Sequence, residues 1–138
     1  AERLGIRYTI NNDASVTPTR PLNLAHCAVN RITASGRLLG EQEKISAYSA
    51  LKAQTIDAAW QVFQEDVRGS IETGKLADFV VLTGNPLENP AEIQFHKVLR
   101  TIRRGRCVFQ ASDCPLAFVE TSPDGADQPR IDANVAGP

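Results

Sequence analysis

The sequence predicts an α+β fold in which one strand and a set of helices precede a β-rich second half. Between residues 21 and 63, apolar side chains recur at spacings of three and four, which is typical of amphipathic helices. From residue 66 onward, short apolar runs lie between turns that contain glycine or proline, which is typical of strands. No internal repeat is present, so the chain reads as one domain-sized unit.

The composition is that of an ordinary globular chain. Its 138 residues include 15 basic and 16 acidic ones, for a formal net charge of -1. This balance provides no basic surface for nucleic acid, and no apolar run reaches the roughly eighteen residues of a membrane span. Because no signal peptide is present either, we expect a cytoplasmic protein with no nucleic-acid or membrane partner. The chain has no methionine, even at position 1, so we also expect a fragment, a processed product or an engineered segment.

Three widely spaced cysteines, Cys27, Cys107 and Cys114, form no CxxC pair. An odd number of this kind favours free thiols in a reducing compartment over a zinc site. A Cys107–Cys114 bridge remains an alternative.

The first strand is predicted at residues 6–10, where apolar and polar residues alternate after a helix end at Leu4-Gly5. A polar loop follows and places Asp13 at the carboxyl end of this strand. Ligands bind at that end in α/β barrels and open α/β sheets. An Asx turn or a helix cap is the alternative role for this aspartate.

Helices are predicted over residues 21–32 and 46–63. Pro21 suits the first turn of the first helix, and Ser46 suits the N-cap of the second. The second stretch forms either two helices or one that breaks near Thr55, which could cap the later part. The single tryptophan of the chain is assigned to core or interface packing.

Two glycines bracket the segment that leads into the β-rich half. Gly69 and Gly74 can take positive φ, so tight turns are expected at both positions. The apolar run Phe79–Leu82 follows and predicts a strand buried on both faces. The segment lacks the serine or threonine after the lysine that a phosphate-binding P-loop requires.

A β-hairpin is predicted over residues 98–110, with Arg104-Gly105 as its turn. Four arginines cluster here, at positions 100, 103, 104 and 106. A solvated hairpin tip explains them. The segment 87–96 before the hairpin is expected to be a loop with one helical turn.

Five motifs follow one another along residues 1 to 110. They are Asn12-Asp13-Ala14-Ser15, Ala28-Val29-Asn30-Arg31, Ser35-Gly36-Arg37-Leu38-Leu39-Gly40, Ala50-Leu51 through Thr55 to Ala58-Ala59, and Gly69 to Asp78. In this order they resemble the carboxyl-terminal portion of the amidohydrolase superfamily, in the amidohydrolase-3 branch that includes N-substituted formamide deformylase. The family's Ser-Asp-Ala-Pro motif keeps its aspartate as Asp13, whereas its serine and proline are replaced.

The resemblance implies an α/β architecture for the intact enzyme. The chain would carry the last β/α unit of a (β/α)8 metal-dependent hydrolase barrel and the C-terminal strands of a composite β-sandwich. Residues 1–66 are then the end of the barrel domain, and residues 67–110 are sandwich strands. Residues 111–138 are expected to form a flexible tail.

The resemblance also implies the chemistry. The family uses one or two divalent metal ions, zinc in the expected case, to lower the pKa of a water that attacks an amide-like carbon. Asp13 matches the final-strand carboxylate that binds metal or accepts the proton of that water, so it is the predicted catalytic and metal-binding residue. The other ligands lie upstream, and His26 and His96 cannot replace them, so this chain alone is not expected to hold metal tightly. Lys75 and Asp78 are assigned structural roles.

These observations predict the C-terminal segment of an amidohydrolase that cleaves carbon–nitrogen bonds other than peptide bonds, inactive on its own. A lone barrel strand and half a sandwich leave an edge and an apolar face uncovered. We therefore expect as partner the missing N-terminal part or a second copy, in at least a dimer. A non-catalytic α+β interaction or oligomerisation module is the alternative. The specificity loops lie outside the chain, so the small amide-like substrate is not identified.

Overall fold

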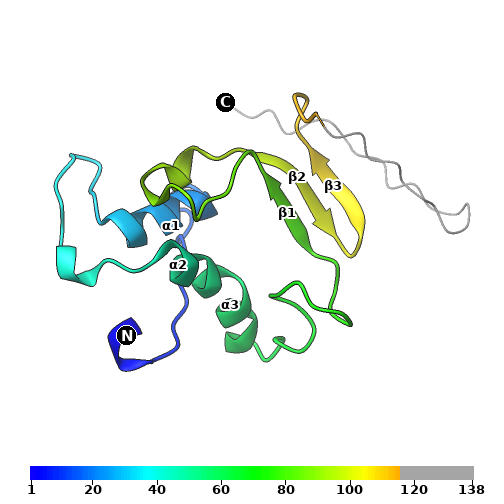
Figure 1. Cartoon of the computed structure of the whole chain (residues 1–138), viewed down its shortest axis with the longest axis horizontal. Helices are drawn as coiled ribbons and strands as arrows, with labels where there is room; N and C mark the ends of the chain where they lie inside the picture. The colour runs from blue at the N-terminus through cyan, green and yellow to red at the C-terminus, as the bar shows by residue number, and fades with distance from the viewer. Residues whose placement is uncertain (116–138) are drawn as a thin grey trace, which may run out of the picture.

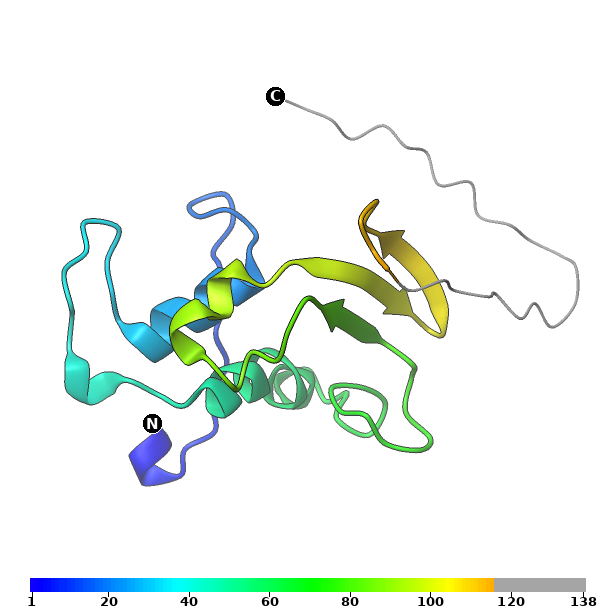
Figure 2. The same ribbon diagram turned by 45° about the horizontal axis from the view of Figure 1, so that its top comes forward.

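Three short helices lie to one side of a three-stranded antiparallel sheet, and both views show this separation (Figures 1 and 2). The computed structural model describes residues 1–115, so most of the tail expected at 111–138 lies outside the described residues. The α+β class is confirmed. The elements are α1 (Pro21–Asn30), α2 (Ala47–Gln54), α3 (Ile56–Gln61), β1 (Phe79–Leu82), β2 (Val98–Arg103) and β3 (Arg106–Gln110), with 3-10 turns η1 (Glu2–Leu4), η2 (Glu41–Glu43) and η3 (Pro90–Phe95).

The apolar core forms where α1 meets α2 and η3. Ile93, on η3, is the one large side chain of the described residues that is fully buried, at 0% exposure. Asn30 Nδ2 donates a hydrogen bond to the Pro90 carbonyl at 2.9 Å and so connects the end of α1 to the start of η3. The buried members of the core are Ala25, Val29, Ala47, Ala50 and Ile93, with Leu22, Ile45 and Leu51 packed against them.

A break at Thr55 separates α2 from α3, so the stretch forms two helices. Ser46 caps α2 as predicted, because its hydroxyl oxygen accepts the Ser49 N–H at 3.0 Å. Thr55 has φ -120° and ψ -95°, outside the helical region. Its hydroxyl donates to the Leu51 carbonyl at 2.8 Å and makes no cap bond to α3, so the predicted capping role of Thr55 is wrong.

The strand predicted at residues 6–10 is not formed within the described chain. A strand needs a neighbour to complete its hydrogen bonds, and β1, β2 and β3 pair with one another. Side chains attach the segment to α3 instead. Thr9 Oγ1 donates to Gln61 Oε1 at 2.7 Å, and Arg7 pairs with Asp57. The segment therefore lies against a helix.

The predicted hairpin is confirmed, with β2 between β1 and β3. Arg104 and Gly105 have φ of 50° and 78°, the pair of positive values that a type I′ turn requires. Asp78 Oδ1 accepts the Arg104 N–H at 2.8 Å, and the Ala77 carbonyl accepts the Gly105 N–H at 2.9 Å. The residues that lead into β1 thus bind the hairpin turn, and Asp78 has the structural role predicted for it.

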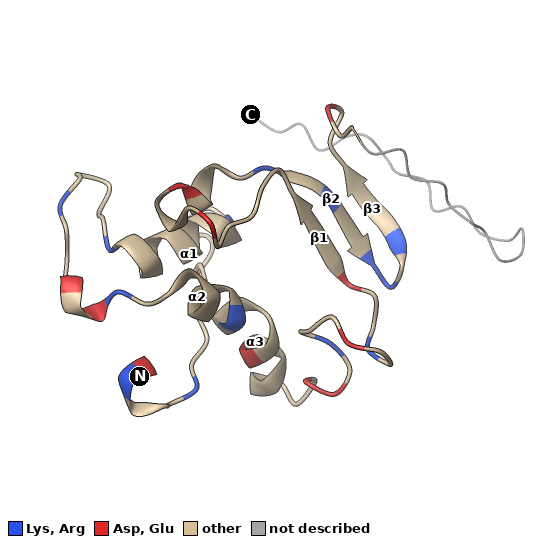
Figure 3. Cartoon of the chain, in the orientation of Figure 1, with Lys and Arg blue, Asp and Glu red and all other residues tan. Residues whose placement is uncertain are grey.

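Two burial predictions for the sheet are wrong. Val80 is 56% exposed, so β1 is not buried on both faces. The reason is that β1 is an edge strand and that the helices contact mainly one another and η3. Arg100, assigned to a solvated tip, is 4% exposed because it lies in the middle of the central strand. Arg103, Arg104 and Arg106 are exposed around the turn (Figure 3).

Two further expectations concern the cysteines and the membrane. Cys27, Cys107 and Cys114 are free thiols, so the alternative Cys107–Cys114 bridge is not formed. Among the described residues, no helix has both the length and the apolar character needed to cross a membrane.

Gly69 lies directly against α3 and joins the helical half to the β-rich half. Its φ of +95° confirms the predicted turn and is a value that residues with a side chain rarely adopt. A Cβ at this position would lie 2.8 Å from Ala59 Cβ and 2.9 Å from Ile56 Cα. The backbone conformation and the lack of space therefore both require glycine here.

Gly69→Ala should lower the free energy of unfolding by about 2–4 kcal/mol, because it adds overpacking to a strained φ. Gly74→Ala is the matched control, since Gly74 has φ +93° with open space at the Cβ position, and only the conformational cost of about 1–2 kcal/mol applies. Urea denaturation followed by circular dichroism measures both. Equal losses would contradict the close contact between Gly69 and α3.

Candidate functional site

Asp13 lies in an exposed turn between the 6–10 segment and α1. Its φ is +48°, in the left-handed region. The side-chain oxygen of Asn11 accepts the Asp13 N–H at 2.9 Å, and the Asp13 carbonyl accepts the Val16 N–H at 2.8 Å. The first bond forms an Asx turn, with Asn11 as the residue that makes it. The Asp13 side chain therefore makes no Asx turn of its own. Asn11 makes the turn, and Asp13 contributes only its backbone N–H.

Two more hydrogen bonds close the loop around Asp13. Asn12 Nδ2 donates to the Pro18 carbonyl at 3.1 Å, and the Thr17 hydroxyl donates to the Asn12 carbonyl. Within residues 1–115, the Asp13 carboxylate itself accepts no hydrogen bond and forms no ion pair. The loop is held by its other polar groups, which leaves this carboxylate available for a ligand.

The Asp13 turn borders an open hollow of about 360 Å³. The hollow extends from the turn to the first residues of α1, the end of α2 and the middle of α3. Its polar lining comes from Asn11, Asn12, Asp13, Thr19 and Gln54. The rest of the lining is apolar, from Ile10, Ala14, Pro21, Leu24 and Ala58, so the hollow offers a small ligand one carboxylate, neutral polar groups and an apolar surface.

A catalytic metal site needs several ligands in one place. Residues 1–115 contain no group of three or more histidine, cysteine, aspartate or glutamate side chains that could hold a metal ion. His26 Nδ1 instead lies 3.0 Å from Asn30 Nδ2, one turn further along α1 and within hydrogen-bond distance. The His96 ring packs against Gly84, where an added Cβ would lie 2.8 Å from its Cε1 atom. Asp13 is therefore a single candidate ligand, and the residues described here do not form a complete catalytic metal site.

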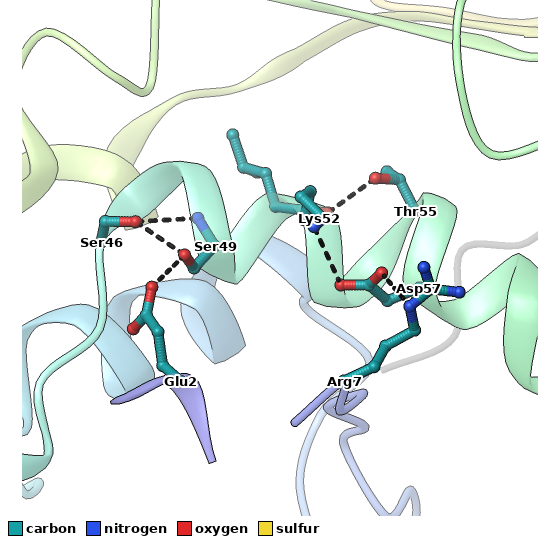
Figure 4. A network of polar contacts seen from close by, with 8 residues as sticks. Glu2, Arg7, Ser46, Ser49, Lys52, Thr55 and Asp57 are labelled. Carbon is teal, nitrogen blue, oxygen red and sulfur yellow. Dashed lines mark hydrogen bonds and ion pairs between the residues drawn. The ribbon is translucent and has the colours of Figure 1, made fainter. Parts of the chain in front are cut away.

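A second polar cluster, which the sequence did not predict, is centred on Asp57 (Figure 4). Asp57 is only 7% exposed. Its carboxylate lies 3.3 Å from Arg7 Nε and 3.9 Å from Lys52 Nζ. A buried carboxylate needs such partners, because removing an unpaired charge from water is costly. The cluster thus connects the N-terminal segment with both α2 and α3.

One face of α3 provides most of the anchors for the N-terminal segment. Asp57, Trp60 and Gln61 are spaced by three and four residues, so they share a side of the helix. The guanidinium of Arg7 lies 4.7 Å from the centroid of the Trp60 ring, and Thr9 donates to Gln61. Trp60 therefore packs against a cation from another segment, and at 42% exposure it is not the core residue that was one of the two expectations.

The polar residues of the Gly69–Asp78 segment bind one another and the hairpin. Lys75 Nζ donates to Ser70 Oγ at 2.6 Å and lies 3.4 Å from Glu72 Oε1. A side-chain hydrogen bond between Ser70 and Glu72, followed by the charge of Lys75, lowers the pKa of the exposed Glu72. With Asp78 bound to the hairpin turn, the charged groups of this motif are engaged in local structure.

The chain belongs to the amidohydrolase family, whose model matches residues 1–109. The resemblance drawn from the five motifs is thereby confirmed. The chain is 32% identical to YtcJ of Bacillus subtilis over 112 residues, which are 78% of this chain and 21% of that protein. It is 33% identical to N-substituted formamide deformylase of Arthrobacter pascens over 98 residues, which are 70% of this chain and 18% of that enzyme.

The fold is similar to part of a solved amidohydrolase from Thermotoga maritima. The superposition has a TM-score of 0.62 with 26% identity, and it covers 80% of this chain and 24% of that structure. The chain therefore spans about a fifth of the length of the curated relatives given above. Its α+β arrangement corresponds to one portion of a larger amidohydrolase.

The tyrosine beside the Asp57 cluster predicts a pH dependence of stability. Burial, followed by the charges of Glu2 and Asp57, raises the pKa of the Tyr8 phenol from its ordinary value of 10.0. Below pH 10 the phenol is neutral in both states, and its contribution to stability is fully present. As the pH rises further, the unfolded chain loses this proton first, so stability falls until the folded-state pKa is passed.

Tyr8→Phe should therefore reduce the loss of thermal stability between about pH 9.5 and pH 11. Tyr48→Phe is the control, because Tyr48 is 64% exposed and the substitution removes the same phenol hydroxyl from a different place. Differential scanning calorimetry across this range measures the melting temperature of each variant. An alkaline slope that is the same for Tyr8→Phe as for the parent chain would contradict the prediction.

Proposed function

We propose that this chain is the C-terminal part of a metal-dependent amidohydrolase that cleaves carbon–nitrogen bonds of small, non-peptide amide-like substrates. The observation that carries the proposal is the position of Asp13. It is an exposed carboxylate with no internal partner among residues 1–115, at an open hollow of mixed polar and apolar lining, in the motif where the family pattern has its final-strand aspartate. Family membership supports the same conclusion.

The role proposed for Asp13 is that of a ligand or a proton acceptor. In such enzymes a divalent metal ion, here expected to be zinc, makes a bound water acidic enough to attack an amide-like carbon. Asp13 would offer one carboxylate to that centre, and the remaining ligands would come from the upstream part of the enzyme. The neutral side chains of Asn12, Thr19 and Gln54 around the hollow suit contacts with an amide-like group.

The proposed architecture assigns residues 1–66 to the end of a (β/α)8 barrel and residues 67–110 to a β-sandwich. The 6–10 segment supports this assignment, because it leads directly into the Asp13 turn and then into α1, as a barrel strand leads into its loop and helix. A missing barrel neighbour would supply the hydrogen bonds that this segment does not make within the described chain.

The proposed partner is the N-terminal part of the enzyme, or a second copy of this chain. Exposed apolar side chains on the sheet support it, including Val80, Val108 and Phe109. Side chains of this kind in sheet strands are normally covered by a second layer. Either partner would make the assembly at least dimeric.

Asp13→Asn, introduced into the enzyme completed with its upstream part, should lower kcat by about 10²–10⁴-fold, because an amide neither accepts a proton nor binds metal as a carboxylate does. Hydrolysis of an N-acyl substrate with added zinc measures the effect. Asp113→Asn is the matched control, since Asp113 is also exposed but does not line the hollow. Circular dichroism should show that both variants fold.

Two results would contradict the proposal. Full turnover by Asp13→Asn would exclude the role of Asp13. A completed protein that neither binds zinc stoichiometrically nor hydrolyses the N-acyl substrate would exclude the enzyme and favour the interaction module.

A further inference from the structure

The conformation of Asp13 depends on one side chain that the family pattern did not point to. With φ +48°, Asp13 occupies a region that costs a residue with a side chain about 1–2 kcal/mol. The Asn11 side-chain oxygen accepts the Asp13 N–H at 2.9 Å and offsets part of this cost. Because φ sets the direction of the Cα–Cβ bond relative to the chain, this hydrogen bond also helps to fix the direction in which the Asp13 side chain leaves the backbone.

Asn11 has no competing structural task among the described residues. Its side chain makes the bond to Asp13 N–H, and its amide nitrogen donates to no group within residues 1–115. Asn11 is exposed and lines the same hollow as Asp13. Asn12, by contrast, closes the far end of the loop through the Pro18 carbonyl. The two neighbouring asparagines therefore have separate roles, and only Asn11 acts on Asp13.

We propose that Asn11 is a positioning residue, which orients the Asp13 carboxylate toward the hollow by accepting the Asp13 backbone N–H. The inference rests on the proposed function of Asp13 in hydrolysis. It predicts that losing the acceptor oxygen misorients a carboxylate that is still present. A shift of this kind affects the chemical step more than substrate binding, and displacements of about 1 Å can cost roughly a hundredfold in rate.

A matched interaction elsewhere in the chain separates positioning from stability. Asn85 Oδ1 accepts the Leu87 N–H at 3.0 Å, which is the same bond between residues i and i+2, away from the hollow. Asn11→Ala removes this bond alone, whereas Asn85→Ala also removes the bond from Asn85 Nδ2 to Glu88 Oε1 at 3.2 Å. Asn85→Ala should therefore lower stability at least as much as Asn11→Ala, whereas only Asn11→Ala should affect catalysis.

The first measurement needs no activity. Amide hydrogen exchange of the 138-residue chain, followed by NMR, should show that Asn11→Ala speeds exchange at the Asp13 N–H by about three- to tenfold, the worth of one ordinary hydrogen bond. Asn85→Ala should leave that amide unchanged. An unchanged exchange rate at Asp13 in Asn11→Ala would overturn the inference at its structural step.

The second measurement uses the completed enzyme with an N-acyl substrate and zinc. Asn11→Ala should lower kcat by about ten- to a hundredfold with little change in KM. Asn11→Asp and Asn11→Ser both retain an acceptor oxygen, and at least one should recover most of the lost kcat. Full activity of Asn11→Ala, or equal loss in all three variants, would overturn the inference.

Asp13→Asn, measured beside these variants, separates a failure of the proposed function from a failure of the positioning role of Asn11. If Asp13→Asn is inactive while Asn11→Ala is fully active, the proposed function stands and the positioning role of Asn11 is wrong. If Asp13→Asn retains full turnover, the proposed function fails and the role of Asn11 in catalysis fails with it.

Discussion

The buried carboxylate of Asp57 is the constraint on which the helical half of this chain depends. A carboxylate at 7% exposure is tolerated only with cations close by, and its two cations come from different places, Arg7 in the N-terminal segment and Lys52 in α2. The pairing of Asp57 with Arg7 therefore fixes the path of the N-terminal segment before it reaches the Asp13 turn. Because Asp13 follows Arg7 by six residues, the position of the hollow depends on a salt bridge that does not touch it.

This arrangement shows how an extended segment can be held without a ladder of backbone hydrogen bonds. Side chains two residues apart in an extended chain point the same way, and residues three or four apart on a helix share a face. Arg7 and Thr9 meet Asp57, Trp60 and Gln61 in this manner. The alternation at residues 6–10 predicted a strand with Ile6, Tyr8 and Ile10 on its apolar face, and no strand is formed there within the described chain. The polar residues of the segment, Arg7 and Thr9, contact a helix instead.

Features that depend on adjacent residues were predictable, and those that depend on distant ones were not. The Ser46 cap, the Gly69 and Gly74 turns and the Arg104-Gly105 hairpin follow from local chemistry, whereas the turn that Asp78 binds lies 26 residues further along the chain. The burial of Arg100, the exposure of Val80 and the packing of Ile93 depend on which element lies beside which. The same division applies to the site. Asp13 was found from its place after an apolar stretch, and the Asx turn of Asn11 is a local contact over two residues that was not predicted. Asp57 acquires its role through contact with the distant Arg7, which no spacing in the sequence reveals.

The limited apolar core explains why single polar and steric contacts matter so much here. Of its five buried members three are alanines, and Ile93 alone is a large side chain fully removed from water. Since hydrophobic stabilisation scales with the apolar area buried, such a core contributes little for its number of residues. The Asp57 cluster then connects the N-terminal segment to the helices, and the close packing of Gly69 against Ala59 connects α3 to the segment that leads into the sheet. Larger side chains such as Phe95 and Phe109 remain at the surface of the β-rich half. Apolar area that would stabilise the chain is thus present but unburied, and a partner that covers it would add the stabilisation that the chain's own core lacks.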